Sequence, residues 1–215
     1  MLDAIHVDLN GPAQKPETVS ALLRAAAGTA ALYGRENAPA SAARMARIVR
    51  DPLRPRGTPL HVVLVRPEIP HNTGAVGRLC VGLGCDLALV RPIGFALSDY
   101  YVRRAGLDYW PHLRLAIHDS WDDFLGRAKP GRMHFLSTKG GRSLYDTAFE
   151  PGDTLVFGSE SAGLPESFYE RYRDALVRIP MPGEHARSLN LANAVSVAVY
   201  EAYRQLLARG AAPGP

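Results

Sequence analysis

The stretch that decides the fold is Leu60–Leu83, which reads LHVVLVRPEIPHNTGAVGRLCVGL. Its first six residues form a compact, β-branched run between Pro59 and Pro67, as expected of a buried strand. From Asn72 onward the apolar residues recur at helical spacing. The stretch therefore predicts a strand followed by a helix.

The same alternation continues toward the C-terminus, which is typical of an α/β fold with a mainly parallel sheet. Ligands of such sheets bind beyond the carboxyl ends of strands, so the loops after Val65, Phe157 and Ile179 are the expected sites of chemistry. Further strands are predicted near Leu87–Val90, Leu113–Ile117, Met133–Ser137, Thr154–Phe157 and Ala175–Ile179, and helices at Asp99–Arg104, Trp121–Ala128, Pro165–Tyr172 and Asn190–Ala208.

The first 57 residues differ in composition from the rest of the chain. They predict a mostly helical or disordered extension that ends in a linker near Gly57, followed by one domain over residues 58–215. Residues 1–57 carry eight Lys and Arg against five Asp and Glu, whereas residues 58–215 carry seventeen against sixteen. Most of the basic excess therefore lies in the extension, where it either contacts phosphate groups or is simply solvated.

The composition and the N-terminal sequence argue against a membrane-spanning or secreted protein. With 47% hydrophobic and 21% charged residues and no apolar run of membrane-spanning length, the chain reads as an ordinary globular protein. The N-terminus lacks the basic start and apolar stretch of a secretory signal, so we expect a cytoplasmic protein. Cys80 and Cys85 are expected to be reduced, partly buried thiols, and no metal site is predicted because further ligands at suitable spacing are lacking.

The first candidate loop is Pro67–Gly74, with Arg78 one helical turn beyond its end. Asn72 or Thr73 is suited to cap the following helix through a side-chain oxygen. Arg78 has two interpretations: its guanidinium points toward the same sheet edge as the loop, or it is an ordinary arginine on a helix surface.

The second candidate loop, Phe157–Pro165, reads FGSESAGLP. Glycines directly after a strand let a ligand approach the backbone, so this loop is suited to hold a cofactor. Glu160 either stabilises the loop by accepting hydrogen bonds or faces a positively charged group.

The third candidate loop, Ile179–Asn190, leads into a helix on which Asn193 and Ser196 form a polar stripe. Asn190 is expected to cap this helix. The stripe either finds polar partners or marks a place where small residues allow close packing against a neighbouring helix.

These three motifs, with the intervening Arg103–Tyr109 and Thr138–Gly140, resemble in order and combination the SPOUT superfamily of RNA methyltransferases. Within it they are similar to the short tRNA wobble-nucleotide 2′-O-methyltransferases of the TrmL type, over residues 60–208. The resemblance implies a parallel-sheet α/β-knot domain with a trefoil knot near the C-terminus. It also implies S-adenosylmethionine as methyl donor, tRNA as substrate, and a homodimer with sites completed across its interface.

The resemblance also implies roles for individual residues. Arg78 is implied to orient the ribose and stabilise the developing 2′-alkoxide, since a side chain with a pKa above about 12 is a poor general base. Ser188 is implied to act in both catalysis and cofactor binding. Arg103, Arg104 and Tyr109 are implied to contact RNA through guanidinium groups and a stacking ring, the alternative for Tyr109 being a packed aromatic. The residues implied to form the cofactor pocket are Leu136, Thr138, Gly158, Glu160, Ile179, Met181, Ser188, Leu189 and Asn193.

Alternative functions stay open at this point. In the first alternative, the same reaction acts on another nucleotide of tRNA or on ribosomal RNA. In the second, the chain is a non-catalytic RNA-binding protein with the same fold. A Rossmann-type methyltransferase is disfavoured because the loop Arg66–Gly74 contains a single glycine and lacks the expected glycine-rich turn.

Overall fold

The structure is a computed structural model that describes residues 59–95 and 109–212. The predicted extension and its boundary near Gly57, the predicted helix Asp99–Arg104, and the two arginines Arg103 and Arg104 lie outside the described residues.

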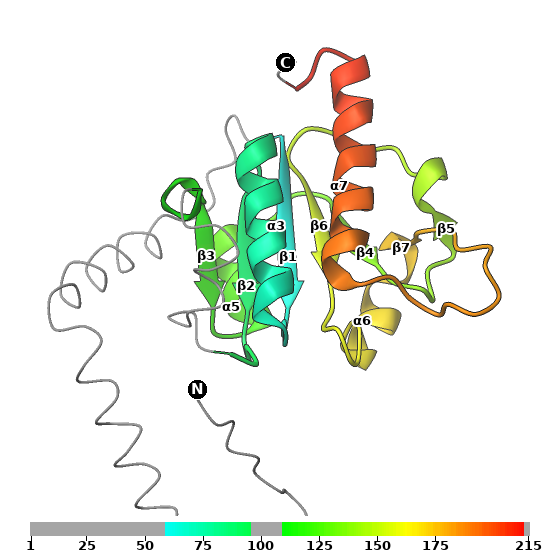
Figure 1. Ribbon diagram of the computed structural model, residues 1–215, viewed down its shortest axis with the longest axis horizontal. Coiled ribbons are helices and arrows are strands. Elements are labelled where there is room, and N and C mark those ends of the chain that lie inside the picture. Colours follow the sequence, from blue (N-terminus) through cyan, green and yellow to red (C-terminus); the bar gives the residue numbers. More distant parts are fainter. Residues whose placement is uncertain (1–58, 96–108, 213–215) are drawn as a thin grey trace, which may run out of the picture. The chain divides into compact units, whose positions relative to one another are not determined.

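The described residues form a parallel seven-stranded sheet with helices on both faces (Figure 1). The strand order is β3-β2-β1-β6-β4-β7-β5, and every neighbouring pair is parallel. This confirms the predicted α/β class. The strands are β1 (Leu60–Val65), β2 (Asp86–Val90), β3 (Leu115–His118), β4 (Met133–Leu136), β5 (Arg142–Ser143), β6 (Asp153–Phe157) and β7 (Leu176–Arg178).

The helices agree with the sequence pattern wherever the structure describes it. Asn190 caps α7, as predicted, by accepting from the backbone N–H groups of Ala192 and Asn193. The helices are α3 (Pro70–Leu83), α5 (Trp121–Ala128), α6 (Glu166–Arg171) and α7 (Leu191–Ala208), and the 3-10 turns are η1 (Trp110–His112), η2 (Leu144–Asp146) and η3 (Arg173–Ala175). None of these helices is long and apolar enough to cross a membrane.

One expectation about α3 is wrong. The helix begins at Pro70, with Ile69 as a capping residue that supplies no side-chain bond, so neither Asn72 nor Thr73 caps it. Proline is favoured at the first helical position because its fixed φ suits the helix and its missing N–H would have no partner there. Asn72 is thereby free for a different contact, described below.

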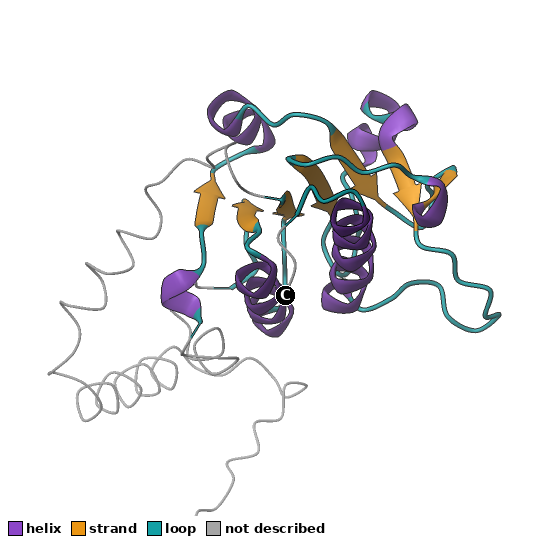
Figure 2. Cartoon of the chain, turned by 90° about the horizontal axis from the view of Figure 1, so that it is seen from above, coloured by secondary structure: helices purple, strands orange, loops and turns teal. Residues whose placement is uncertain are grey.

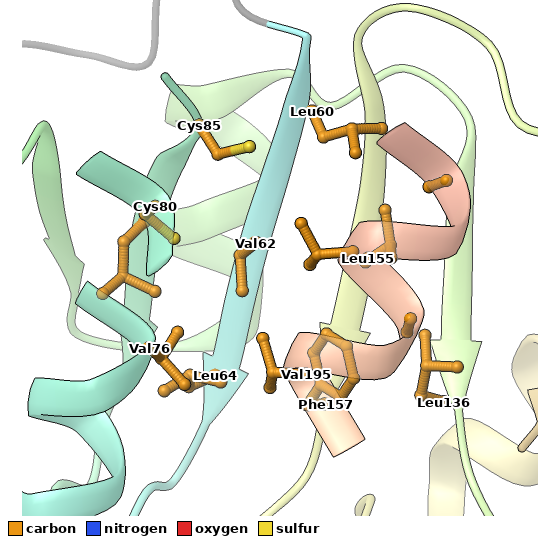
Figure 3. Close-up of a cluster of buried hydrophobic side chains, with 14 of the residues drawn as sticks. Leu60, Val62, Leu64, Val76, Cys80, Cys85, Leu136, Leu155, Phe157 and Val195 are labelled. Atoms are coloured by element: carbon orange, nitrogen blue, oxygen red, sulfur yellow. The ribbon is translucent and has the colours of Figure 1, made fainter. Parts of the chain in front are cut away.

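The β1 strand places alternate side chains on opposite faces of the sheet. Val62 and Leu64 pack beneath α3 and α7, as Figure 3 shows, whereas Val63 and Val65 pack with Phe124 of α5 on the other face. Figure 2 shows the two helical layers on either side of the strands. Because both faces are covered, β1 is buried along its whole length, which explains its continuous apolar sequence.

The two cysteines are free thiols, as expected, and both are fully rather than partly buried. Burial raises the pKa of Cys85 to about 12, with a further increase from the neighbouring carboxylate of Asp86. Both thiols therefore stay protonated and serve as small apolar core residues.

Candidate functional site

A cleft of about 530 Å³ lies at the carboxyl edge of the sheet. The strands β1, β6, β4 and β7 are consecutive neighbours, so the loops that follow them converge at one edge, toward which the arrowheads point in Figure 1. The volume of the cleft falls in the range of about 300–1,000 Å³ that is usual for small-molecule sites.

Glu160 ties the second loop to the first. Its carboxylate accepts hydrogen bonds from the backbone N–H groups of Glu68 and Ile69 at 2.8 and 3.1 Å, and from Nδ2 of Asn72 at 2.9 Å. In return, the Glu68 carboxylate accepts from the hydroxyl of Ser161 at 2.6 Å. Of the two interpretations of Glu160, the structure shows the loop-stabilising acceptor.

Asn72 extends this connection to the third loop. Its Oδ1 accepts a hydrogen bond from Nδ2 of Asn190 at 3.0 Å, while Oδ1 of Asn190 caps α7. A continuous chain of hydrogen bonds therefore runs from Glu160 through Asn72 to Asn190. It holds together three segments that lie far apart in the sequence, so the cleft is preformed by the polypeptide itself.

The second loop folds back on itself so tightly that Gly158 has no room for a side chain. Ser159 and Gly163 exchange two backbone hydrogen bonds of 2.9 Å, and Gly163 has a φ of +71°. A Cβ added at Gly158 would lie 2.0 Å from the carbonyl carbon of Gly163. Glycine is required at Gly158 by this close approach, and at Gly163 by its left-handed backbone.

The loop after β4 crosses closely over β7. The Ser137 N–H donates to the carbonyl of Val177 at 2.9 Å, and a Cβ added at Gly140 would lie 2.6 Å from the carbonyl carbon of Val177. These contacts bring Thr138 and Lys139 to the cleft wall.

Eight of the nine residues predicted for the cofactor pocket line the cleft. Asn193 is the exception: it is exposed on α7, and its backbone N–H donates to Oδ1 of Asn190. Ser196, the other member of the polar stripe, donates to the carbonyl of Ala192 on its own helix. The Ser196 hydroxyl is therefore satisfied within its own helix, whereas the Asn193 side chain is exposed. The predicted residues in the lining are Leu136, Thr138, Gly158, Glu160, Ile179, Met181, Ser188 and Leu189.

Arg78 does not line the cleft of its own chain. It follows Asn72 by six residues, which places the two side chains about 120° apart around the helix axis. It is exposed on α3, and its guanidinium lies over the ring of Tyr109, with Cζ 5.3 Å from the ring centroid. Of the two interpretations of Arg78, the structure of the single chain shows the second, an arginine on a helix surface.

Tyr109 is buried rather than exposed. Its side chain packs against α3, and its hydroxyl donates to the carbonyl of Gly74 at 2.7 Å. A ring that stacks on an RNA base needs an open face, so the packed-aromatic alternative describes Tyr109 in this structure.

Tyr169, Lys139 and Arg187 are among the cleft residues that the sequence analysis did not assign to the site. Tyr169 of α6 contacts the Ser137 hydroxyl at 3.1 Å, and the ammonium of Lys139 lies 4.5 Å from the centroid of the Tyr169 ring. Arg187 lines the cleft beside Ser188. Lys139 and Arg187 stood inside recognised motifs, but Tyr169 had no signal, because it reaches the cleft from a helix whose pattern describes packing alone.

The fold and cleft define an α/β protein with a cleft of small-molecule size among the loops of adjacent parallel strands. Residues 59–200 match the SpoU rRNA Methylase family, and the chain belongs to that family.

The similar proteins include tRNA (cytidine(34)-2′-O)-methyltransferases. That of Acidovorax sp. (strain JS42) is 51% identical over 149 residues, covering 67% of this chain and 91% of the relative. That of Burkholderia ambifaria is 49% identical over 149 residues, covering 67% of this chain and 94% of the relative.

Solved structures show the same likeness. One solved structure, described as giving insight into the 2-OH methylation of C/U34 on tRNA, is 52% identical to this chain, with a TM-score of 0.66. The match covers 70% of this chain and 97% of the other protein's chain. The SpoU methyltransferase AviRb from Streptomyces viridochromogenes, in complex with AdoMet, is 27% identical, with a TM-score of 0.61. That match covers 69% of this chain and 60% of AviRb.

Proposed function

We propose that this chain transfers a methyl group from S-adenosylmethionine to the ribose 2′-hydroxyl of nucleotide 34, the wobble position of tRNA. The observation that carries the proposal is the cleft, which gathers eight residues that the SPOUT resemblance assigns to the cofactor. The substrate is inferred from relatives about half identical to this chain that act on cytidine 34 of tRNA.

The chemistry of the cleft fits S-adenosylmethionine. Leu136, Ile179 and Leu189 offer apolar surface to an adenine ring, and the loop that contains Gly158 lines the same cleft. Lys139 and Arg187 line the same cleft and are suited to the cofactor's carboxylate. The Glu160 carboxylate is already engaged by three donors, so its role is to hold the cleft open rather than to bind the ligand.

S-adenosylmethionine, when bound, supplies a methyl group that its sulfonium activates for attack by the ribose oxygen. We assign Arg78 to orienting that ribose and stabilising the charge that develops on its 2′-oxygen, since a guanidinium cannot accept the proton. Ser188 lines the cleft and is assigned to the same reaction centre. The main work of the chain is positioning, which by itself can supply a large part of a rate acceleration.

We further propose that the enzyme is a homodimer. Arg78 lies outside the cleft of its own chain, so a second copy is needed to bring an Arg78 to each reaction centre. The exposed side of α7 carries Val197, Tyr200 and Leu207, which are 37%, 56% and 37% exposed and recur at helical spacing. A stripe of large apolar residues rimmed by polar ones is typical of a protein–protein interface.

The decisive experiment incubates the protein with unmodified tRNA, and in a parallel reaction with unmodified ribosomal RNA, together with S-adenosylmethionine labelled in its methyl group, and maps the label by nuclease digestion. We expect label at the 2′-oxygen of nucleotide 34. Label in ribosomal RNA or at another tRNA position would overturn the assigned substrate. No transfer to any RNA, with cofactor binding demonstrated, would favour a non-catalytic RNA-binding protein.

Substitution of Arg78 tests its assigned role. Arg78→Ala is expected to lower methyl transfer by about 100-fold or more, with cofactor affinity nearly unchanged, because the proposed contact forms at the reacting ribose. Single-turnover transfer and equilibrium binding measure the two quantities. Arg127→Ala is the control, because Arg127 is an exposed arginine of α5 on the opposite face of the sheet. Parallel loss of transfer and binding in Arg78→Ala would instead mark a structural arginine.

A further inference from the structure

Tyr109 makes two contacts with the helix that carries Arg78. Its hydroxyl donates to the carbonyl of Gly74 at 2.7 Å, and its ring lies beneath the Arg78 guanidinium at 5.3 Å. Gly74 and Arg78 are four residues apart, so both contacts fall on adjacent turns of α3. The Tyr109 side chain therefore contacts both the backbone of α3 and the Arg78 guanidinium that projects from this helix.

The position of Tyr109 relative to α3 is fixed by tight packing. The following turn, η1, and Leu113 directly after it lie so close to the helix that a Cβ added at Gly77 would stand 3.1 Å from the side chain of Leu113 and 3.3 Å from that of Trp110. Tyr109 and Trp110 pack edge to face, with centroids 6.5 Å apart. Only 8% of Tyr109 is exposed. The ring is consequently a rigid platform rather than a mobile surface group.

Arg78 needs such a platform because its own helix does little to hold it. An exposed arginine has many rotamers, and it loses catalytic efficiency whenever the guanidinium is away from the reacting atoms. Among the residues that the structure describes, no carboxylate lies within salt-bridge distance of Arg78. A cation–π contact restricts the side chain while leaving its N–H donors available to a substrate, which an ion pair would occupy.

We propose that Tyr109 is a positioning residue that holds the Arg78 guanidinium in its reactive orientation. The inference rests on the role assigned to Arg78 above. It differs from RNA contact by Tyr109 itself, because a positioning residue acts through Arg78 and a stacking residue acts on tRNA directly.

A double-mutant cycle tests the proposal. Tyr109→Leu removes both contacts and is expected to lower kcat about 3- to 10-fold, whereas Tyr109→Phe removes the hydroxyl alone and is expected to lower kcat about 2-fold. The KM for tRNA and the affinity for S-adenosylmethionine stay unchanged. Neither substitution has a further effect in the Arg78→Ala background, because nothing is left to position.

The outcomes separate this proposal from the proposed function. Should Arg78→Ala leave methyl transfer intact, the role assigned to Arg78 fails. If Arg78→Ala is impaired but a Tyr109 substitution lowers kcat by the same factor with or without Arg78, the positioning role is overturned. An effect confined to the KM for tRNA, or no effect on kcat, overturns it as well and, in the first case, favours direct RNA contact.

A second measurement reads the orientation of Arg78 without any turnover. The Nε–H resonance of Arg78, assigned by its absence in Arg78→Ala, is expected to carry a ring-current shift from Tyr109. In Tyr109→Leu that shift disappears and the order parameter of the group falls, whereas in Tyr109→Phe the shift persists. An Nε–H group equally ordered in wild type and Tyr109→Leu would show that the ring does not hold the arginine.

Discussion

At the scale of single residues, the site depends on polar side chains that act on the polypeptide rather than on a ligand. Glu160 and Asn72 were ambiguous in the sequence, because an acceptor in a loop and an amide near a helix start each have several possible partners. The structure joins them in one hydrogen-bonded chain with Asn190. Their partners lie about ninety or more positions away, so no local pattern contains them.

This arrangement predicts that Glu160→Gln weakens the cleft. A glutamine keeps one acceptor oxygen, but its NH2 group replaces the other oxygen and then faces an N–H donor. At least one of the three hydrogen bonds is therefore lost. We expect the free energy of unfolding to fall by about 1–2 kcal/mol and cofactor affinity to fall about 10-fold. Chemical denaturation and equilibrium binding measure these changes. Glu170→Gln, at an exposed position of α6, is the control. An unaltered cofactor affinity would contradict the assigned role.

At the scale of elements, the sequence predicts nearly every strand and helix that the structure describes. The predicted strand Leu60–Val65 and helix Trp121–Ala128 match the observed bounds. The short strand β5 and the 3-10 turns were missed, because two or three residues are too few to display a period. The glycine-rich turn after β6 was identified as a ligand loop from composition, but its close backbone contact came only from the structure.

That close contact predicts the effect of Gly158→Ala. The added methyl group would lie 2.0 Å from the carbonyl carbon of Gly163, so the turn must shift and carry Glu160 with it. We expect cofactor affinity to fall by about 10-fold or more and thermal stability to decrease. Calorimetric titration and thermal unfolding test this. Gly141→Ala is the matched control in a neighbouring loop, since its Cβ meets nothing within 4 Å. Equal affinity in both variants would show that the turn tolerates the shift.

At the scale of the whole molecule, one observation stands out: the cleft of a single chain lacks the arginine assigned to the reaction. Arg78 and the apolar side of α7 both face outward from the helical layer that covers one face of the sheet. The proposed homodimer accounts for both features at once. The trefoil knot implied by the resemblance stays a prediction.

Disruption of the apolar stripe tests the dimer. Tyr200→Asp places a charge where a partner would exclude water, which costs several kcal/mol unless the charge is paired. We expect sedimentation velocity to show a dimer for wild type and a monomer for the variant, with methyl transfer reduced at least 10-fold. Tyr145→Asp is the control, because Tyr145 is 61% exposed and lies outside α7. A monomeric wild type, or an active monomeric variant, would exclude completion of the site across an interface.

The sequence by itself determined the α/β class, the succession along the chain of the described strands and helices apart from β5 and the 3-10 turns, the cap of α7 and the loops that form the cleft. It did so because hydrophobic periodicity and turn chemistry are local properties that can be read within a few residues. The resemblance of three loops to one family added eight of the residues that line the cleft.

Only the tertiary structure decided which way individual side chains turn. It placed Asn193 and Arg78 outside the cleft, engaged Glu160 with the first loop and buried Tyr109 beneath Arg78. These outcomes depend on contacts between segments that the sheet order brings together, namely β1 beside β6 and the first loop beside α7. Such contacts follow from how the whole domain packs, so no local pattern in the sequence predicts them.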